Sequence, residues 1–434
     1  MPGRFRRSAV LFGLSGLLLL AGCRSYLAGR GAATPDDPKI LTMMSLVDGA
    51  DDAFERDTLN RFAASRHNLQ ARYIPAFESD DQRLALYKKL FKERSPQPDL
   101  CEVDVIWPGM IADDLVDLTP YFRDQLRDFP PELLRSYAVR GRLIAIPIFL
   151  DSGVLYYRSD LLRKYGFKTA PQTWDQLEKM ARTIQRGERR SDPHFWSYVW
   201  QGGATEALTC NALEWQASEG GGRVIEPGGT VTVCNPKAVR ALARAVSWIG
   251  TISPPGITAY TEDDALNVYR AGHAAFLRGW TSSYGCLRAE APLIREHTAA
   301  ALLPAGPGGH SSTLGGIAIA VSKYSEHRDE AIAALRELVS EPAQIRRVME
   351  GGASPTRISL QRRADLMQQT PFHGSLLGRQ MLDGLVARPS AVSGRAYDQV
   401  SAAYSSAVHS ALTRQVPPAI ALARLQAELV RIKP

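Results

Sequence analysis

The segment IPIFLDSGVLYYRSDLLRKYGFKTAPQTWDQL, residues 146–177, contains a strand signal followed by a helix signal. The apolar run over residues 143–150 predicts a buried strand, and Asp151 follows it directly. Thr173 and Gln176 form the pattern of a capping box, in which two side chains satisfy free backbone groups of the first helical turn. The segment therefore predicts a strand, an acidic side chain at its end, and a helix that begins at Thr173.

The part of the chain before this segment alternates between strand and helix signals. Predicted strands cover residues 39–46, 69–77 and 103–107, and predicted helices cover residues 51–65 and 80–93. Strands that alternate with helices of this length indicate a mostly parallel sheet with helices on both faces. The predicted fold class is therefore α/β.

Two further helices and two linkers are expected after the opening segment. Asn235, followed by proline, predicts the cap of a helix that runs to Gly250, and residues 326–340 predict a second amphipathic helix. Proline, glycine and serine are concentrated in residues 302–314 and 351–355, which we interpret as linkers.

The N-terminus resembles the signal of a bacterial lipoprotein. Three arginines precede the apolar residues 10–22, a run shorter than the roughly 20 residues that a membrane span needs. The run ends in Leu-Ala-Gly-Cys, which resembles the lipobox, whose cysteine receives a diacylglycerol before cleavage. We expect removal of residues 1–22, lipidation of Cys23 and a flexible tether over residues 23–38. The alternative is an ordinary secretory signal, and either signal places the mature protein outside the cytoplasmic membrane.

Charge and composition argue against several classes of partner. Without residues 1–22 the chain has 412 residues, and its formal net charge falls from +7 to +4 because three arginines are lost. The remaining basic residues are dispersed among acidic ones, whereas a nucleic-acid interface needs clustered Lys and Arg. No later run reaches the length of a membrane span, so we expect a soluble body tethered only at its N-terminus.

Four cysteines remain besides Cys23. Cys101, Cys210, Cys234 and Cys286 allow three disulfide pairings, and Cys210 and Cys234 are closest in sequence. Four free thiols are the alternative, and the residues leave this choice open. Neither the cysteines nor the eight histidines show the spacing of metal ligands, so no metal and no cofactor are expected.

Common catalytic motifs are absent, while residues suited to sugar binding are present. The sequence has no P-loop, no dinucleotide-binding glycine motif, no HExxH, no EF-hand loop and no GxSxG. A glycosidase pair of carboxylates stays open, because the sequence cannot fix the separation of two such groups. Trp107, Asp151 and Trp280 lie at the ends of predicted strands, where an indole can stack on a sugar ring and a carboxylate can accept hydroxyl hydrogen bonds. Taken singly, each of these residues is more often explained by packing or capping.

Five stretches occur in order along the chain: QPDLCEVDVIWPGMIADDLVDLTPYF, the opening segment, FLRGWTSSYG, LPAGPGGHSSTLGGIAIAVSKYSEHRDEA and GGASPTRISL. Together they resemble the family-1 extracellular solute-binding proteins of sugar ABC transporters, in particular the trehalose/maltose-binding lipoproteins. The pattern IPxxxDxGxLYYRxDLLxKYG followed by PxTWDxL is specific, and LPxGPGG followed by TLGG is moderately so. The resemblance runs from about residue 38 to residue 410.

The resemblance implies a periplasmic-binding-protein type II-like fold. Two α/β lobes would enclose a ligand cleft and would be joined by three crossover segments, near residues 148–150, 303–305 and 351–354. The implied lobes are residues 39–149 plus 304–353 for the N-lobe and residues 150–303 plus 354–434 for the C-lobe.

The resemblance also implies a set of ligand-binding residues. Two acidic positions would accept sugar hydroxyls, a tryptophan would stack on the ring, a glycine would let the backbone approach, an arginine would bind hydroxyls and a glutamine would line the cleft. In this sequence these residues are Asp104, Asp151, Trp280, Gly316, Arg388 and Gln201.

Three departures from the family pattern affect the expected ligand. Ile317 and Thr205 stand where relatives often carry aromatic residues, and TSSYG after Trp280 replaces an expected proline-aromatic continuation. The resemblance therefore implies the fold more strongly than it implies a disaccharide ligand.

The function expected from the resemblance is that of a lipid-anchored, monomeric sugar-binding protein, with no enzymatic activity. It would capture a disaccharide such as trehalose or maltose by hinge closure and deliver it to an ABC transporter permease. One alternative is a sensor or scavenging receptor for another solute. The other is a lipid-anchored glycoside hydrolase that uses Asp151 with a second acid such as Glu206.

Overall fold

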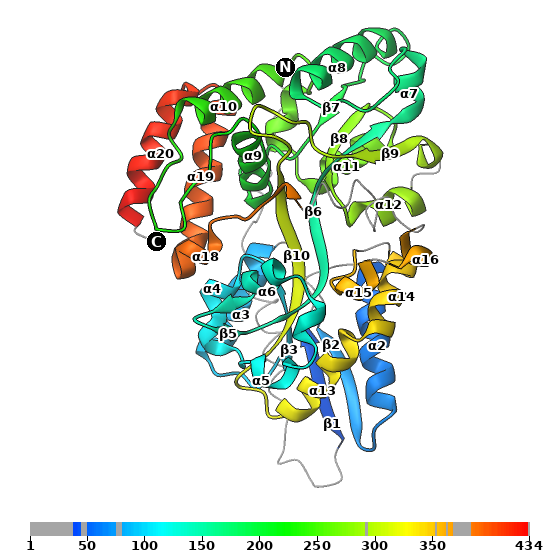
Figure 1. Ribbon diagram of the computed structural model, residues 1–434, viewed down its shortest axis with the longest axis vertical. Coiled ribbons are helices and arrows are strands. Elements are labelled where there is room, and N and C mark those ends of the chain that lie inside the picture. The colour runs from blue at the N-terminus through cyan, green and yellow to red at the C-terminus, as the bar shows by residue number, and fades with distance from the viewer. Residues whose placement is uncertain are drawn as a thin grey trace, which may run out of the picture.

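The computed structural model describes residues 38–44, 50–74, 80–290, 294–351, 354–361, 363–367 and 383–432. Figure 1 shows two lobes of helices and strands, with two long strands that run from one lobe into the other. The expected signal peptide, Cys23 and nearly all of the expected tether lie outside the described residues. Within the described ranges, no helix combines the length and the apolar character that a membrane span requires.

The described strands form one mixed sheet of nine strands and one short hairpin. The hairpin consists of β4 (Ala138–Val139) and β5 (Arg142–Leu143). The strands of the sheet are β1 (Lys39–Met44), β2 (Leu69–Ile74), β3 (Leu100–Asp104), β6 (Ile146–Arg158), β7 (Tyr198–Val199), β8 (Phe276–Trp280), β9 (Thr298–Ala301), β10 (Ser312–Val321) and β11 (Leu385–Val386).

The order of the strands places β6 and β10 at the junction of the two lobes. Along the sheet the order is β2-β1-β3-β10-β6-β8-β7, with β11 beside β10 and β9 beside β6. β1 pairs in parallel with β2 and β3, whereas β10 runs antiparallel to both β3 and β6. The second half of β6 then pairs antiparallel with β8 and β9. One strand thus belongs to both lobes, as Figure 1 shows.

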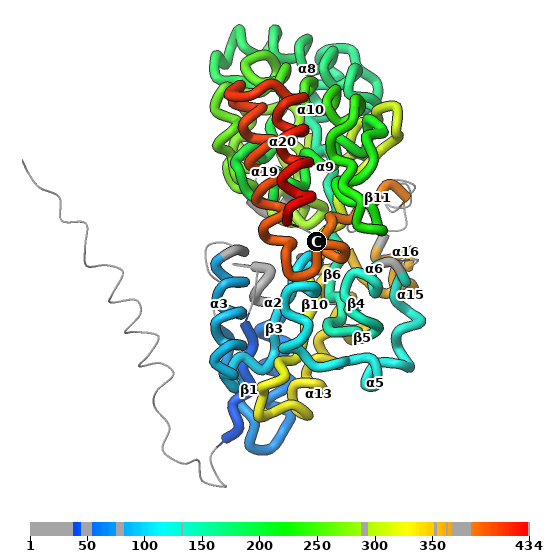
Figure 2. Tube along the Cα trace, turned by 90° about the vertical axis from the view of Figure 1, so that its left-hand side faces the viewer, coloured from blue at the N-terminus to red at the C-terminus, as the bar shows by residue number. Residues whose placement is uncertain are grey.

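Helices cover both parts of this sheet (Figures 1 and 2). They are α2 (Ala50–Ala64), α3 (Asp80–Lys92), α4 (Pro108–Ile111), α5 (Thr119–Phe122), α6 (Pro131–Ser136), α7 (Ser159–Lys164), α8 (Trp174–Glu188), α9 (Glu206–Ser218), α10 (Pro236–Trp248), α11 (Glu262–Arg270), α12 (Ser283–Glu290), α13 (Arg328–Leu338), α14 (Glu341–Gly351), α15 (Ile358–Gln361), α16 (Ala364–Met367), α18 (Ser390–Ser393), α19 (Tyr397–Leu412) and α20 (Pro418–Ile432). α19 and α20 pack side by side on the outside of the lobe that contains α8 and α10.

Each lobe has its own apolar core. The first core contains residues of β1, β3 and β10 and the first half of β6, ending there at Leu150. The second core contains the second half of β6 from Val154, together with β8 and residues of α8 to α10, α19 and α20. The three residues of β6 between these cores, 151–153, include no member of either cluster. The α/β fold class predicted from the sequence is confirmed.

Several element boundaries differ from the sequence prediction, among them the end of the third strand. β3 ends at Asp104 rather than at Trp107, because the Asp104 carboxylate accepts a hydrogen bond from the Ile106 backbone N–H at 3.0 Å and turns the chain. Proline then occupies the first position of α4, where its missing N–H costs nothing. Trp107 is buried and packs edge-on against Tyr87, with ring centroids 5.9 Å apart, so it belongs to the core.

The strand before Asp151 also differs from the prediction. β6 does not stop at Leu150 but continues through Asp151 to Arg158, because β10 and then β8 pair with it. Asp151 faces Gly315 of β10 in this ladder, and Gly153 faces Trp280 of β8. Asp151 thus sits inside the strand that joins the two lobes.

The predicted helix caps are largely confirmed. Thr173 accepts a hydrogen bond from the Gln176 N–H at 3.3 Å, but the Gln176 side chain accepts from the N–H of Gln172 rather than from that of Thr173. Asn235 caps α10 through the N–H groups of residues 237 and 238, and this helix ends at Trp248, two residues before the predicted end.

The structure shows the state of four cysteines and the contacts of two residues that were predicted for the C-lobe. Cys101, Cys210, Cys234 and Cys286 are all free thiols, which is the second of the two alternatives. The lobe boundaries stay predictions. Among the residues predicted for the C-lobe, Thr356 donates to the Pro147 carbonyl at 3.0 Å and Arg357 donates to the Val339 carbonyl at 3.1 Å, so both bond to the first lobe.

Candidate ligand-binding site

The carboxyl ends of β1, β2 and β3 meet at one edge of the first-lobe sheet, because these three strands are parallel. Asp104 is the last residue of β3 and lies at this edge. Its carboxylate contacts Arg388, and Arg388 contacts Glu206 at the start of α9 in the second lobe. The edge therefore faces the second lobe, which is where open α/β sheets place their ligands.

Asp151 lies at the junction of the lobes and is 8% exposed. One carboxylate oxygen accepts from the Thr281 hydroxyl at 2.5 Å and from the Ser152 N–H at 2.9 Å. Ser282 donates its N–H to the same oxygen at 3.2 Å and its hydroxyl to the other oxygen at 2.6 Å. Burial raises the pKa of Asp151, although these hydrogen bonds oppose the shift. Asp151 thus fixes the turn that follows β8.

Trp280, the last residue of β8, is half-buried beside this carboxylate. The guanidinium of Arg278 lies 4.0 Å from the centroid of its ring. A Cβ placed on Gly315 would lie 3.0 Å from Cζ3 of the indole and 3.3 Å from Cβ of Asp151. The indole, the carboxylate and the bare backbone of β10 therefore converge at one point, where β6 and β10 cross from one lobe into the other.

Gly316 is explained by the packing of strands. Its φ of +135° is disfavoured for any residue with a side chain, and a Cβ there would lie 2.6 Å from the carbonyl oxygen of Phe149. The Gly316 carbonyl accepts from the Tyr137 hydroxyl at 3.0 Å and from the Val105 N–H at 3.2 Å. Glycine is needed at this position because the backbone of β6 approaches it closely.

Arg388 is buried between the two lobes. It donates to Glu206 at 2.9 Å and to both Asp104 and the Leu314 carbonyl at 3.4 Å, while its Nε is buried with no hydrogen-bond partner in the part of the chain that the structure describes. Burial alone would lower the pKa of Arg388, but the neighbouring acidic groups, Cys210 and Asp104 first among them, raise it above the ordinary value. Arg388 therefore stays charged and links carboxylates from both lobes.

Gln201 lies deeper than a residue that lines an open cleft. It is 2% exposed, donates its amide to the Arg278 carbonyl at 3.0 Å and accepts from the Asn211 amide at 3.0 Å. Both the nitrogen and the oxygen of its amide thus form hydrogen bonds inside the second lobe, and one of these bonds joins it to β8.

The six predicted site residues therefore form two groups and one outlier. Asp151, Trp280 and Gly316 meet where β6, β8 and β10 run side by side. Asp104 and Arg388 form the interlobe ion pair, and the Leu314 carbonyl connects it to β10. Gln201 is the outlier.

Sequence reasoning missed two charged residues next to Trp280. Arg278 and Glu214 form an ion pair in which each side chain is 1% exposed. Arg278 could have been found, because it lies two residues before Trp280 and alternate residues of a strand share a face. Glu214 could not, because it comes from α9, 64 residues away in the chain.

The two carboxylates of the hydrolase alternative are both occupied by internal donors. Asp151 accepts the four hydrogen bonds described above. Glu206 accepts from Arg388 and from the hydroxyls of Tyr397 and Ser401. In addition, no group of three or more His, Cys, Asp or Glu side chains among the described residues could hold a metal ion.

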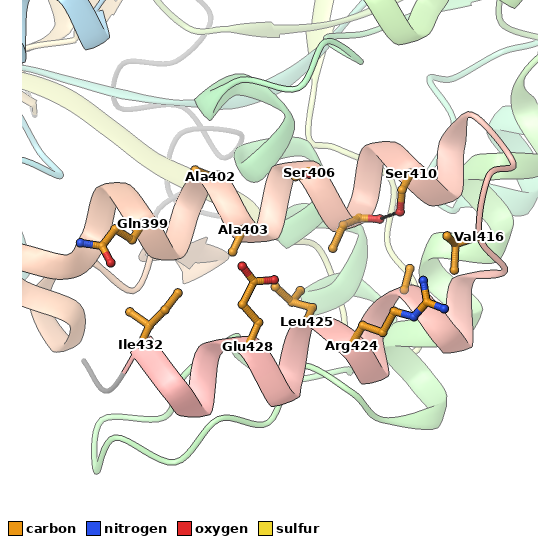
Figure 3. Close-up of a pocket in the computed structure, with 12 residues that line it drawn as sticks. Gln399, Ala402, Ala403, Ser406, Ser410, Val416, Arg424, Leu425, Glu428 and Ile432 are labelled. Atoms are coloured by element: carbon orange, nitrogen blue, oxygen red, sulfur yellow. Dashed lines mark hydrogen bonds between the residues drawn. The ribbon is translucent and has the colours of Figure 1, made fainter.

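A separate hollow lies between α19 and α20, away from this site (Figure 3). Small side chains such as Ala402 and Ala403 line it, with Arg424 and Glu428 reaching across from α20. It contains none of the six predicted site residues. The site at the crossing strands is the better candidate, because it gathers aromatic, acidic and backbone groups from both lobes.

Comparisons with known proteins agree with this architecture. Residues 51–345 match the family model of the bacterial extracellular solute-binding proteins. A "Probable ABC transporter-binding protein" from Deinococcus radiodurans is 43% identical over 358 residues, which cover 82% of this chain and 85% of that protein.

Solved structures are similar over nearly the whole chain. The structure "Maltose bound T. maritima MalE3" matches with a TM-score of 0.84 and 34% identity, covering 91% of this chain and 99% of that one. A solute-binding protein from Thermotoga lettingae, bound with alpha-D-tagatose, matches with a TM-score of 0.79 and 20% identity, covering 91% and 100% of the two chains. At that identity the second match speaks for the fold alone. The family match, the Deinococcus relative and the two-lobed fold together establish that this chain belongs to the bacterial extracellular solute-binding proteins.

Proposed function

We propose that this protein is the solute-binding component of a sugar ABC transporter and that it binds its sugar where β6, β8 and β10 meet. The observation that carries the proposal is the convergence of the Trp280 indole, the Asp151 carboxylate and the side-chain-free backbone at Gly315. An indole beside polar groups suits a sugar, whose ring has an apolar face and hydroxyl edges. The 34% identity to a maltose-bound protein supports the same class of ligand.

Within that class we propose a disaccharide such as maltose or trehalose. The bound tagatose of a structural relative shows that this fold also holds a single sugar in another protein, so the size of the ligand is the part of the proposal to test first. Ile317, one of the three departures from the family pattern, is 8% exposed and packs in the first core. Its side chain therefore presents no open surface on which a sugar ring could stack.

Hinge closure would couple binding to transport. The two lobes have separate cores, and β6 and β10 connect them, so bending at these strands would move one lobe against the other. A sugar shifts that equilibrium only if it binds the closed form more tightly than the open one. Contacts from both lobes would supply this difference, and the permease would recognise the closed form of a monomeric binding protein.

The test is a thermal-shift screen of the full-length chain against maltose, trehalose, tagatose, sugar alcohols and unrelated solutes. A sugar that binds only the folded protein adds about 2.7 kcal/mol of stability at a hundred times its Kd. We expect a shift with at least one sugar and its loss in Trp280→Ala, whose ligand-free midpoint should change far less. The matched control is Trp196→Ala, which removes another partly exposed indole of the same lobe. No shift with any sugar would refute the sugar class.

We also propose that lipidation of Cys23 anchors the protein to the membrane and that residues 23–38 form the tether. The sequence carries this proposal through the lipobox and its short apolar run. Cys23→Ser should move the protein from the membrane fraction to the soluble fraction and abolish metabolic labelling with a palmitate analogue. If the Cys23→Ser protein stayed in the membrane fraction, that result would contradict lipid anchoring through Cys23.

A further inference from the structure

Trp280 rests on a buried charged group rather than on apolar side chains alone. The guanidinium carbon of Arg278 lies 4.0 Å from the centroid of the indole, at the distance of a cation–π contact. Both residues belong to β8 and are two positions apart, so their side chains leave the strand on the same face. The orientation of the indole therefore depends on where the guanidinium plane lies.

Glu214 of α9 fixes that plane. It accepts from Nε of Arg278 at 3.0 Å and from Nη2 at 2.6 Å, which is the two-pronged geometry of a carboxylate with a guanidinium. Each side chain is 1% exposed, and Nη1 of Arg278 is buried without a hydrogen-bond partner among the described residues. A buried apolar pair of similar volume is often as stable as such an ion pair, so stability alone gives little reason for charge here.

The same carboxylate touches both strands that join the lobes. It accepts a hydrogen bond from the Thr313 N–H of β10 at 3.0 Å. A Cβ on Gly153 of β6 would lie 2.1 Å from Oε1 of Glu214, so no side chain fits between this strand and the carboxylate. Gly153 in turn pairs with Trp280 across the sheet. The ion pair thus connects the indole to β6 and β10 at the point where they pass between the lobes.

We propose that Arg278 and Glu214 are positioning residues of the ligand site, which hold the Trp280 indole in its binding orientation and tie it to the crossing strands. This inference rests on the proposed function, because it takes sugar to stack on Trp280. An indole that is already fixed before binding loses less freedom when the sugar arrives, so the pair raises affinity without touching the ligand.

Arg278→Lys is the first variant. Lysine keeps a positive charge for Glu214 but has neither the planar face nor the two-pronged fork of arginine. The full-length chain is labelled with 5-fluorotryptophan, and the Trp280 resonance in the fluorine NMR spectrum is assigned by its absence in Trp280→Phe. We expect Arg278→Lys to shift or broaden this resonance without ligand and to raise the Kd for maltose about tenfold. If maltose does not bind the wild type, the first sugar that does is used.

Arg189→Lys is the matched control. Arg189 stacks on Trp196 with a separation of 3.9 Å, in the same lobe but away from the crossing strands. This variant should move the Trp196 resonance and leave the Kd within about twofold of the wild type. If Arg278→Lys does not fold, the double variant Arg278→Met with Glu214→Leu removes both charges together and should show the same loss of affinity.

The outcomes separate this inference from the proposed function. An unchanged Trp280 resonance and an unchanged Kd in Arg278→Lys, with only a lower thermal midpoint, would show a merely structural ion pair and overturn the inference. A wild-type Trp280 resonance that responds to no sugar would overturn the proposed function. The resonance of the ligand-free variant would still show whether Arg278 orients the indole.

Discussion

Two buried arginines lie at the junction of the lobes, and their surroundings differ in one instructive way. Among the described residues, Arg278 pairs with one carboxylate, that of Glu214, and both residues lie on elements of the second lobe. Arg388 has two carboxylate partners, Glu206 of the second lobe and Asp104 of the first.

The distances follow the same division. The Arg278 pair is two-pronged, at 2.6 and 3.0 Å, whereas Arg388 makes single contacts at 2.9 and 3.4 Å. An ion pair within one rigid body can be tight because its members never separate. One that spans two bodies must tolerate their relative movement, and the longer contact of Arg388 is the one that reaches the other lobe. The Arg278–Glu214 pair therefore suits a rigid support within one lobe. The Arg388–Asp104 contact suits an interaction that changes as the lobes move.

The largest expected effect comes from Glu214→Gln. This change leaves the Arg278 charge buried with no carboxylate, so we expect the free energy of unfolding to fall by about 3–5 kcal/mol. Chemical denaturation measures the change. Adding Arg278→Met should restore part of the loss, because it removes the unpaired charge, and a double variant less stable than Glu214→Gln would contradict the buried-charge explanation.

The same substitution in the other network should cost less. Glu206→Gln leaves Arg388 with Asp104 as a counter-charge, so we expect the free energy of unfolding to fall by about 1–3 kcal/mol. The main cause is that the hydroxyls of Tyr397 and Ser401, which now donate to two carboxylate oxygens, would have one amide oxygen as acceptor. Asp104→Asn weakens the 3.4 Å contact with Arg388 and keeps a side-chain oxygen for the Ile106 N–H, so it should cost less than Glu206→Gln in the same denaturation assay. Equal losses for Glu206→Gln and Glu214→Gln would erase the distinction between the two arginines.

The last expected effect concerns pH and Asp151, which lies at the junction of the lobes. Burial raises its pKa in the folded state above 3.8, so the folded protein binds this proton more tightly than the unfolded chain does. The stability it contributes is therefore present below pH 3.8 and is lost as the pH rises through the raised value, with a slope of at most about 1.4 kcal/mol per pH unit.

Asp151→Asn removes this dependence while keeping a carbonyl oxygen for the Thr281 hydroxyl. The unfolding free energy of the wild type should fall relative to that of this variant as the pH rises above 3.8, and the difference should become constant above the raised pKa. Denaturation curves at several pH values measure it. A difference that stays constant across the range would contradict the raised pKa.

The sequence by itself determined the fold class, the family and most elements of the first lobe. Period-2 and helical patterns depend only on neighbouring residues, so β1, α2, β2 and α3 lie within a few residues of their predicted ranges. The caps at Thr173 and Asn235 are equally local and were found for the same reason. The end of β3 was misplaced, since the short turn made by Asp104 has no period to detect.

Only the tertiary structure decided what the site residues contact. Gln201 lies two residues after the short strand β7, yet it is buried behind β8, because its amide bonds to the Arg278 carbonyl and to Asn211. Gly316 follows from the approach of Phe149, which lies 167 residues earlier in the chain. Glu214 lies on α9 and Arg278 on β8, so no local sequence pattern could have predicted their ion pair. Local periodicity fixes elements, but a buried charge is defined by its partner, and the partner is known only when distant segments have packed together.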